Sequence, residues 1–227
     1  MNNPSRSLTY EPIQSNTPSV TSKPSTSYNN EIHYTKSEIK ESDCELNACV
    51  QLDCSGLCKN ASKGTCTNSA LSQRNFVRTY ISESKLQGEF GLYTKEKVNE
   101  GDCLGEYTGE TMTSQQAITR IGMRQGGRYM MQVTPTHYVD AQEKGSSLRF
   151  VNHACGTGAN VRCKVVTVIR ANGSNELCLG FYAKEEIAKN TELFLDYTCG
   201  YHNHMTQEMN LQGLLNGDCQ CMKCQGE

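Results

Sequence analysis

The sequence predicts a mostly-β domain between a disordered N-terminal tail and small cysteine-rich segments. Three observations support this fold class: the start of the chain is polar, short apolar runs separated by Gly, Asn, Asp and Glu fill its middle, and cysteines cluster on both sides. Apolar runs of this length between turn residues are typical of β-strands. With 227 residues, the chain has room for one sizeable domain and a small one.

The N-terminal tail is poor in apolar residues. Twenty of the first 30 residues are Ser, Thr, Asn or Pro, including four of the five prolines of the chain. Such a segment buries too little apolar surface to offset the entropy lost on ordering, so we expect residues 1–43 to be disordered. Its Ser-Pro and Thr-Pro pairs could be phosphorylated, but such pairs are common in disordered tails, and we assign the tail no function.

Four apolar runs in the middle of the chain are expected strands, at 103–107, 129–133, 161–169 and 177–183. The third run alternates apolar residues with Arg162 and Lys164, which predicts one solvent-exposed face. Its expected buried face consists of Val161, Cys163, Val165, Thr167 and Ile169. A helical pattern occurs only at 113–123, where Thr113 or Ser114 is the expected N-cap.

Composition excludes several classes of protein. A formal net charge of −2 argues against a general nucleic-acid binder, and direct DNA binding is not expected to dominate, although a basic peptide substrate remains compatible. The sequence contains no apolar run of about 18 residues and no secretory signal, so we expect an intracellular, soluble protein with no membrane contact. In a reducing compartment, the 13 cysteines are expected to bind zinc and not to form disulfides.

The cysteines form two clusters. Five fall between residues 44 and 66 in a segment with too little apolar content to fold unaided, so a metal would supply its stability. Three more lie within the last nine residues of the chain. Five cysteines lie between the clusters, and four of these, Cys103, Cys163, Cys178 and Cys199, fit scattered thiols better than a metal site.

Two segments carry the strongest functional signal. Residues 149–155 read RFVNHAC, and residues 192–197 read ELFLDY. FGL at 90–92, EYTGE at 106–110 and YVDA at 138–141 precede both of them, in that order. Together these segments resemble the defining motifs of the SET-domain protein lysine methyltransferases, RFxNHxC and ELxxDY, and the segments that accompany them. The cysteine clusters resemble the associated-with-SET (AWS) and post-SET modules of that family.

The resemblance implies four parts: a tail at 1–43, an AWS-like zinc module at 44–76, a SET domain at 77–201 and a post-SET zinc module at 202–227. The SET fold consists of small curved β-sheets with a pseudoknot, in which the RFxNHxC segment passes through a loop near ELxxDY. By resemblance, one zinc is bound by Cys155, Cys219, Cys221 and Cys224. At least one more is expected among Cys44, Cys49, Cys54, Cys58 and Cys66.

The resemblance also implies a cofactor, S-adenosylmethionine, and roles for individual residues. Tyr197 is the catalytic candidate, Tyr129 is the second wall of the lysine channel, and Leu195 occupies the position that controls how many methyl groups are added. The residues expected to bind S-adenosylmethionine are Glu89, Phe90, Gly91, Arg128, Tyr129, Asn152, His153, Tyr197 and Gln220. Asp140, Asp196 and Glu106 are expected to form structural hydrogen bonds and not to act as acids or bases.

The chemistry fits this assignment. Neutralising a lysine with a pKa of about 10.4 at pH 7 costs about 4.6 kcal/mol. An apolar channel and a neighbouring sulfonium charge both reduce that cost, so no carboxylate or histidine base is required. A tyrosine hydroxyl can then align the amine with the methyl group, which is catalysis by orientation and electrostatics.

Several positions depart from the family pattern. The loop at 156–160 is two residues longer and lacks a proline, the last cysteines are spaced C-x-C-x2-C, and Phe90 replaces a tryptophan. We expect a nuclear, chromosome-associated enzyme that methylates a histone tail or nucleosome, of the type that modifies lysine 36 of histone H3. The alternatives are methylation of a non-histone protein and a catalytically weakened SET-domain scaffold on chromatin.

Overall fold

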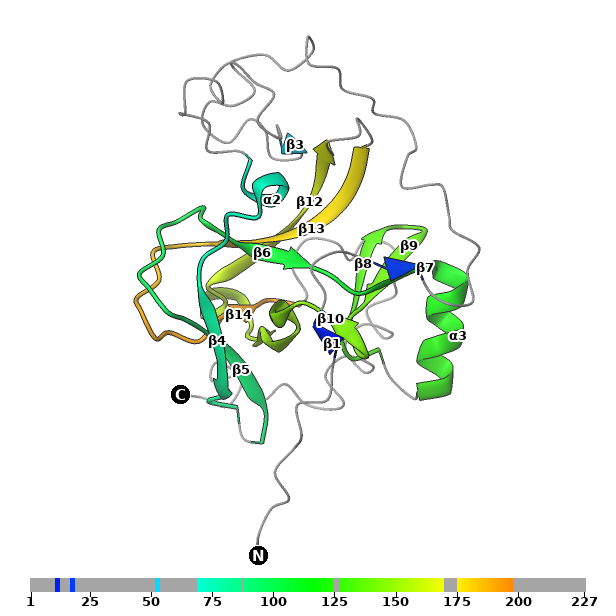
Figure 1. Cartoon of the computed structure of the whole chain (residues 1–227). Helices are drawn as coiled ribbons and strands as arrows, with labels where there is room; N and C mark the ends of the chain where they lie inside the picture. Colours follow the sequence, from blue (N-terminus) through cyan, green and yellow to red (C-terminus); the bar gives the residue numbers. More distant parts are fainter. Residues whose placement is uncertain are drawn as a thin grey trace, which may run out of the picture.

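Strands dominate the part of the chain that the structure describes (Figure 1). The structure, a computed structural model, describes residues 11–12, 17–18, 52–53, 69–86, 88–124, 127–169 and 175–197. Its helices are α2 (Ala70–Gln73) and α3 (Ser114–Arg124), with 3-10 turns η2 (Ser147–Phe150) and η3 (Gly156–Gly158). Its strands are β1 (Glu11–Pro12), β2 (Thr17–Pro18), β3 (Leu52–Asp53), β4 (Thr79–Glu83), β5 (Phe90–Thr94), β6 (Cys103–Tyr107), β7 (Glu110–Thr113), β8 (Met130–Thr134), β9 (His137–Asp140), β10 (Lys144–Gly145), β11 (Asn152–His153), β12 (Val161–Ile169), β13 (Asn175–Ala183) and β14 (Phe194–Leu195).

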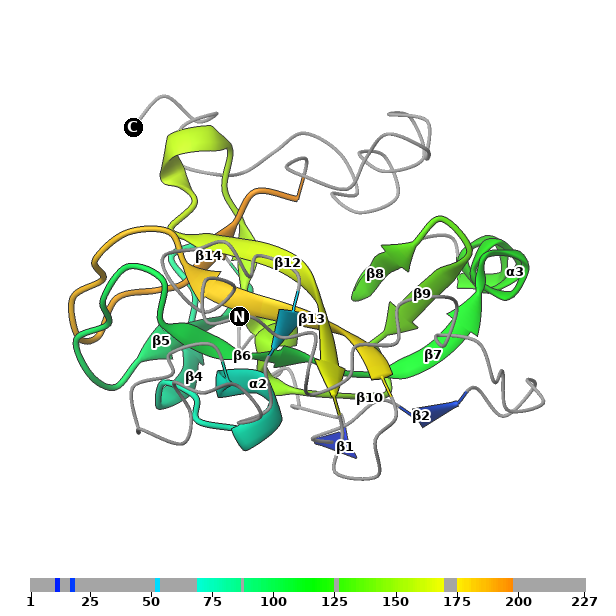
Figure 2. The ribbon, with the colours of Figure 1, turned by 90° about the horizontal axis from the view of Figure 1, so that it is seen from above.

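The largest sheet has the order β11-β14-β12-β13-β6, with β3 paired beside β12. Strands β12 and β13 pair antiparallel over their whole length, and β6 continues the sheet beside β13. The separate hairpin β4-β5 lies at the other side of the main core, as Figures 1 and 2 show. Apolar side chains from the large sheet and the hairpin meet in one core, which includes Leu92, Leu179, Phe181 and Leu193.

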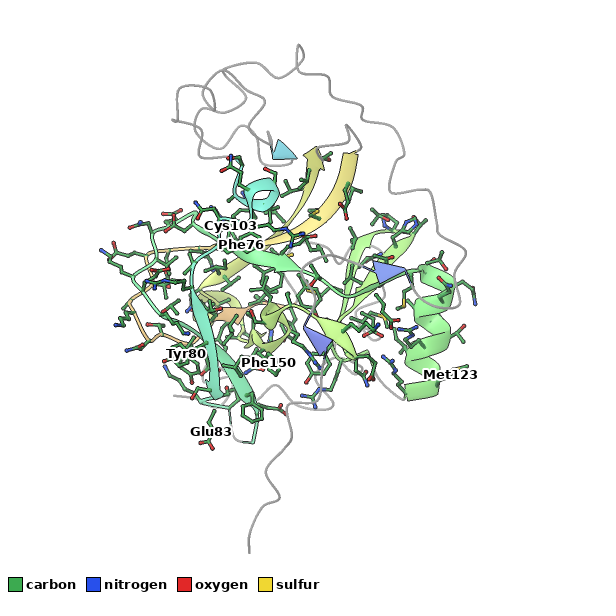
Figure 3. All side chains as sticks on the ribbon, viewed as in Figure 1. Phe76, Tyr80, Glu83, Cys103, Met123 and Phe150 are labelled. Atoms are coloured by element: carbon green, nitrogen blue, oxygen red, sulfur yellow. The ribbon has the colours of Figure 1, made fainter. Side chains whose placement is uncertain are left out.

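Strand β12 has two covered faces, which corrects the expectation of a solvent-exposed face along its length. Val161 belongs to the main core, but Val166 and Val168 pack on the other side against Leu71 of α2. Phe76 and Cys103 meet beneath the same helix (Figure 3). The short helix α2 therefore covers the face that alternation predicts to be wet, and the sequence pattern alone does not reveal it because α2 is only four residues long.

The helix α3 begins as the sequence predicts. The backbone N–H of Gln116 donates to Thr113 Oγ1 at 3.4 Å, and the N–H of Thr113 donates to Gln116 Oε1 at 2.8 Å. This reciprocal pair is a capping box and confirms Thr113 as the N-cap. Ala117 and Ile121 of the helix then pack against Met130 and Tyr138 of the second sheet.

The second sheet has the order β2-β7-β9-β8, and α3 lies beside it (Figure 2). Its edge strand β2 comes from the N-terminal segment and pairs parallel with β7, while β1 pairs parallel with β10. Within the expected disordered tail at 1–43, these four residues form short strands, and the rest of that segment lies outside the described residues. The backbones of these four residues pair with open strand edges. The low apolar content of the segment could not predict this pairing.

Removing the paired N-terminal residues should loosen the second sheet. Deleting residues 1–18 removes both short pairings, and each lost backbone hydrogen bond contributes about 0.5–1.5 kcal/mol. We expect the free energy of unfolding to fall by about 1–3 kcal/mol and the amides of Glu110–Thr113 to exchange faster with solvent. Hydrogen exchange measures this change, and deletion of residues 1–9, which leaves both strands in place, is the matched control. Equal protection of β7 in the two truncated chains would show that the pairings are unimportant.

The expected strands are otherwise confirmed. The bounds of β6 and β12 agree with the apolar runs, β8 begins one residue later than expected, and β13 begins two residues earlier. Among the described residues, no helix has the length and apolar character needed to span a membrane.

Candidate functional site

The two segments with the strongest motif signal lie side by side. Strand β11 pairs parallel with β14, so that Asn152 faces Phe194 and His153 faces Leu195. The N–H of Ala154 donates to the carbonyl of Leu195 at 3.2 Å. The sequence resemblance predicts this juxtaposition of Asn152 and His153 with the residues around Tyr197.

Asn152 connects this strand pair to the start of β5. Its Nδ2 donates to the carbonyl of Phe90 at 2.9 Å and lies 3.1 Å from Ser84 Oγ. A half-buried amide with these partners holds two backbones, 62 residues apart in the sequence, at a fixed separation. The expected cofactor residues Phe90, Gly91 and Asn152 therefore occupy one place in the fold.

Glu192 supports the contact between Asn152 and β5. Its side chain, 1% exposed, accepts a hydrogen bond from the N–H of Lys85 at 2.9 Å and from Ser84 Oγ, and Tyr93 Oη lies 3.0 Å from it. A Cβ at position 91 would clash with this carboxylate, so the close approach of β5 requires Gly91. Burial, followed by the hydrogen bond to Glu192, raises the pKa of Tyr93 to about 12, so its hydroxyl stays a neutral donor. The motif contains Glu192, but its role as the hub of this network could not be predicted from sequence.

His153 is held between two partners. Its Nδ1 accepts a hydrogen bond from the backbone N–H of Tyr197 at 3.0 Å, so the proton of the neutral ring is assigned to Nε2. Nε2 lies 3.2 Å from Cys155 Sγ. Burial lowers the pKa of His153, which favours the neutral ring.

Tyr197 lies next to this imidazole, with ring centroids 5.1 Å apart. Its hydroxyl donates to the carbonyl of Val151 at 2.7 Å. Burial raises the pKa of Tyr197 well above its ordinary value. Tyr129 and Glu89 also raise it by electrostatic interaction, whereas Arg128 lowers it. The hydroxyl is therefore a neutral, fixed dipole at physiological pH and not a base.

Tyr129 adopts a strained backbone conformation. Its φ of 64° lies in the left-handed region, which costs a residue other than glycine roughly 1–3 kcal/mol. The guanidinium carbon of Arg149 lies 4.1 Å from the centre of the Tyr129 ring, and that of Arg128 lies 5.7 Å from it. Arg128 also forms an ion pair with Glu89 at 3.1 Å. The expected residues Glu89, Arg128 and Tyr129 are thus brought together at the start of β8.

The loop after Cys155 is firmly held, although it is longer than the family pattern. Asp196 Oδ2 accepts a hydrogen bond from the N–H of Gly156 at 2.8 Å. The side chain of Asn160 donates to the carbonyl of Glu192 and accepts from the N–H of Phe194, both at 2.9 Å. Asn160 was not among the expected site residues, and nothing in its immediate sequence signals these long-range bonds. Asp196 and Asp140 both accept the hydrogen bonds expected of them.

The expected zinc ligands are described only in part. Cys155 is a partly exposed cysteine whose Sγ lies beside His153 Nε2. The other expected zinc ligands, Cys44, Cys49, Cys54, Cys58, Cys66, Cys219, Cys221 and Cys224, lie outside the described residues, as does the expected cofactor residue Gln220. Within the described ranges, a different group with suitable spacing for a metal consists of Glu106, Glu176 and Cys178. Both glutamates and Cys178 make other interactions in the fold.

Leu195 is buried in the main core, against which Tyr129 and Tyr197 also pack. It belongs to β14 and pairs with both β11 and β12. The position expected to control product multiplicity is therefore a packed core position close to the two tyrosines.

Comparison with known proteins places these features in a family context. Residues 89–198 match the SET domain. The chain is 34% identical over 137 residues to the histone-lysine N-methyltransferase EZ2 of Zea mays, covering 60% of this chain and 14% of the maize protein. It is 29% identical over 187 residues to the lysine-36-specific histone H3 methyltransferase of Mycosarcoma maydis, covering 77% of this chain and 18% of that protein.

Solved structures of polycomb repressive complex 2 share the fold. An active complex in the stimulated state superposes with a TM-score of 0.54 at 27% identity, covering 65% of this chain and 18% of that one. A second structure, in an autoinhibited conformation bound to S-adenosylmethionine, has a TM-score of 0.55 at 22% identity, covering 74% of this chain and 21% of that one, and supports the fold alone. Residues 89–198 of this chain therefore form a SET domain, and the chain is a homologue of histone-lysine N-methyltransferases.

Proposed function

We propose that this chain transfers methyl groups from S-adenosylmethionine to a lysine of a histone tail, in the nucleus and on chromatin. The observation that carries the proposal is the placement of Tyr197, whose neutral hydroxyl is fixed by Val151 beside Asn152 and His153. Histone-lysine methyltransferase homologues of the same domain support the reaction class.

The donor pocket would be formed where β5 and β11 meet. Backbone at Phe90 and Gly91, with Asn152 and His153, would hold S-adenosylmethionine, whose sulfonium supplies an activated methyl group. The absence of a side chain at Gly91 and the amide of Asn152, fixed at 2.9 Å from the carbonyl of Phe90, fit a pocket shaped by backbone. Glu89 and Arg128 would border it with their ion pair, and Gln220 would lie over the adenine.

The acceptor lysine requires orientation more than a base. Its deprotonation at pH 7 costs about 4.6 kcal/mol in water, and an apolar environment lowers that cost. Burial raises the pKa of Tyr197, so its hydroxyl is protonated at this pH and cannot accept the proton of the lysine. That proton leaves to solvent. The Tyr197 hydroxyl donates to Val151, so its lone pairs remain available to align the amine.

The peptide can enter along β8. In the described part of the chain this strand pairs only with β9, so its other edge offers backbone groups to an added strand. Tyr129 immediately precedes β8, and a peptide bound there would present its lysine close to the proposed channel wall.

Two groups of relatives bear on which histone lysine this chain modifies. The match to the lysine-36-specific enzymes extends over 77% of this chain, whereas the match to the maize EZ2 protein covers 60% at higher identity. We favour lysine 36 of histone H3 because the longer match leaves less of the chain without a counterpart. Methylation of a non-histone protein, or a weakened scaffold, are the alternatives.

Incubation of the purified chain with labelled S-adenosylmethionine and recombinant nucleosomes tests the proposal. We expect label on histone H3, lost when lysine 36 is replaced by arginine and kept when lysine 27 is replaced. Loss with the lysine 27 replacement instead would reassign the site. Nucleosome binding without transfer would favour the scaffold, and transfer only to other proteins would favour a non-histone substrate.

Metal analysis tests the two proposed zinc modules. Four thiolates make a closed tetrahedral zinc site, and we expect two or three zinc ions per chain, one of them bound by Cys155 with the last three cysteines. Replacing Cys155 by serine should remove about one ion, because three remaining thiolates bind zinc more weakly. Replacing Cys163 by serine is the control, since burial raises the pKa of this partly buried thiol to about 12 and it is not an expected ligand. One ion or none in the wild type would contradict either the site formed by Cys155 with the last three cysteines or the zinc cluster at residues 44–66.

Leu195→Tyr should shift the product toward monomethyl-lysine. A tyrosine hydroxyl at this position can hold a water that a methylated amine must displace, whereas leucine holds none. We therefore expect the wild type to add more than one methyl group, slowly, because the smaller leucine lets the amine move away from the reactive geometry. Mass spectrometry of the modified peptide reads the outcome directly. A wild type that stops at one methyl group under excess cofactor would refute the expectation.

A further inference from the structure

Two arginines of α3 converge on one buried carboxylate. Arg120 Nη1 lies 3.0 Å and Arg124 Nη1 lies 2.6 Å from Asp140 Oδ2, and only 1% of the Asp140 side chain is exposed. The two arginines are four residues apart and therefore lie on the same face of the helix. Arg120 also contacts Glu110 of β7 at 2.8 Å, and Arg124 contacts Gln142 at 3.0 Å. We call Arg120, Arg124 and Asp140 the α3 clamp.

The clamp joins α3 to the centre of the second sheet. Asp140 lies in β9, with Glu110 of β7 opposite it on one side and Met130 of β8 on the other. Its second oxygen accepts the N–H of Gln142 at 2.9 Å, so the carboxylate also fixes the chain that leaves β9. Figures 1 and 2 show α3 lying along this sheet and away from the β4-β5 hairpin.

The residue next to Asp140 holds the backbone of Tyr129. The N–H of Ala141 donates to the carbonyl of Tyr129 at 2.9 Å, and the hydroxyl of Tyr107 donates to the same oxygen at 2.8 Å. Tyr129 has a φ of 64°, which a tyrosine keeps only where its surroundings determine it. Ala141 follows Asp140 directly in the chain, so the contacts of the two arginines with the Asp140 carboxylate lie one residue away from this hydrogen bond.

We propose that Arg120 and Arg124 are positioning residues that act through Asp140 and Ala141 to hold Tyr129 in its left-handed conformation. Their role as determinants of substrate use rests on the proposed function, in which Tyr129 forms a wall of the lysine channel. Most of the proposed donor pocket is built from β5, β11 and the Glu192 network and not from the clamp, so we expect loss of the clamp to affect peptide turnover much more than donor affinity, although Tyr129 also borders that pocket.

Hydrogen exchange tests the positioning step without any activity. In Arg124→Ala, we expect the amide of Ala141 to exchange at least about tenfold faster, while the amide of Val98, bonded to the carbonyl of Ile187, changes by less than about twofold. In a Tyr129→Gly background the same substitution should have less effect, since glycine adopts this φ without strain. Unchanged Ala141 exchange, or an equal rise at Val98, would overturn the proposal.

Kinetics test the consequence for substrate use. Arg124→Ala should lower kcat/KM for a histone peptide about tenfold or more, because small displacements of a channel wall are costly, with the Kd for S-adenosylmethionine within about twofold of wild type. Asp140→Asn should behave similarly, and Arg124→Lys should restore part of the loss. Arg78→Ala is the matched control, since it breaks an ion pair with Glu96 in which the arginine side chain is 74% exposed.

Failure of the proposed function and failure of the positioning role would give different results. A wild type that transfers no methyl group to any histone would refute the proposed function, and the exchange experiment would still decide whether the clamp holds Tyr129. A wild type that is active, with donor affinity falling in parallel with peptide turnover in Arg124→Ala, would refute the positioning role alone.

Discussion

Tyr197→Phe is expected to lower the rate of methyl transfer by roughly 100-fold or more while the affinity for S-adenosylmethionine stays within about twofold, by analogy with the loss of one preorganised polar group from an active site. The substitution removes only the hydroxyl that lies 2.7 Å from the carbonyl of Val151. The ring still packs beside His153, and the backbone N–H that donates to His153 Nδ1 is unchanged. Single-turnover transfer and calorimetric donor binding, measured on the same preparation, separate the two effects.

The matched control for this prediction is Tyr80→Phe. This substitution also removes one tyrosine hydroxyl from the chain. The hydroxyl of Tyr80, on β4, lies 3.5 Å from Asn190 Oδ1 in an exposed contact. We expect wild-type turnover from that variant. If Tyr197→Phe also turned over at the wild-type rate, the hydroxyl would have no part in aligning the amine, and the catalytic assignment would be wrong.

The sequence predicts those parts of the fold that depend on local pattern. β6 and β12 appear as apolar runs between turn residues, and the capping box at Thr113 is a local signal of four residues. Pairings that are only two residues long, such as β1 with β10, depend on backbone hydrogen bonds and leave no side-chain pattern to detect. The second covered face of β12 was missed for a related reason, because α2 is too short to show helical periodicity.

The site was predictable through its motifs but not through its contacts. The resemblance identified Asn152, His153 and Tyr197, and the structure brings them together. It could not indicate that Asn160 ties the loop to β14, or that Asp140 is held by two arginines, because those partners are distant in sequence and ordinary in type. Long-range polar contacts of this kind are set by the packed fold and not by local propensity.

Glu192→Ala is expected to lower the free energy of unfolding by roughly 2–4 kcal/mol, since it removes the acceptor for several donors in a buried network. The N–H of Lys85 loses a partner at 2.9 Å, and the hydroxyl of Ser84 and the amide of Asn152 lose a shared neighbour. Calorimetric melting should show a fall in Tm of roughly 5–15 °C. Glu96→Ala is the control, because Glu96 makes an exposed ion pair with Arg78, and such pairs contribute about 0–1 kcal/mol.

The same variant separates stability from donor binding. Glu192 holds Asn152, Ser84 and the close approach of β5 at Gly91, so its loss should weaken S-adenosylmethionine binding even at temperatures where the chain is folded. Glu192→Gln keeps the volume and one acceptor oxygen, and its new amide cannot accept from both Lys85 and Ser84, so an intermediate loss is expected. If Glu192→Ala melted like the wild type, the buried carboxylate would not be the hub of the network. If it melted early but bound the donor with full affinity, the network would stabilise the fold without shaping the pocket.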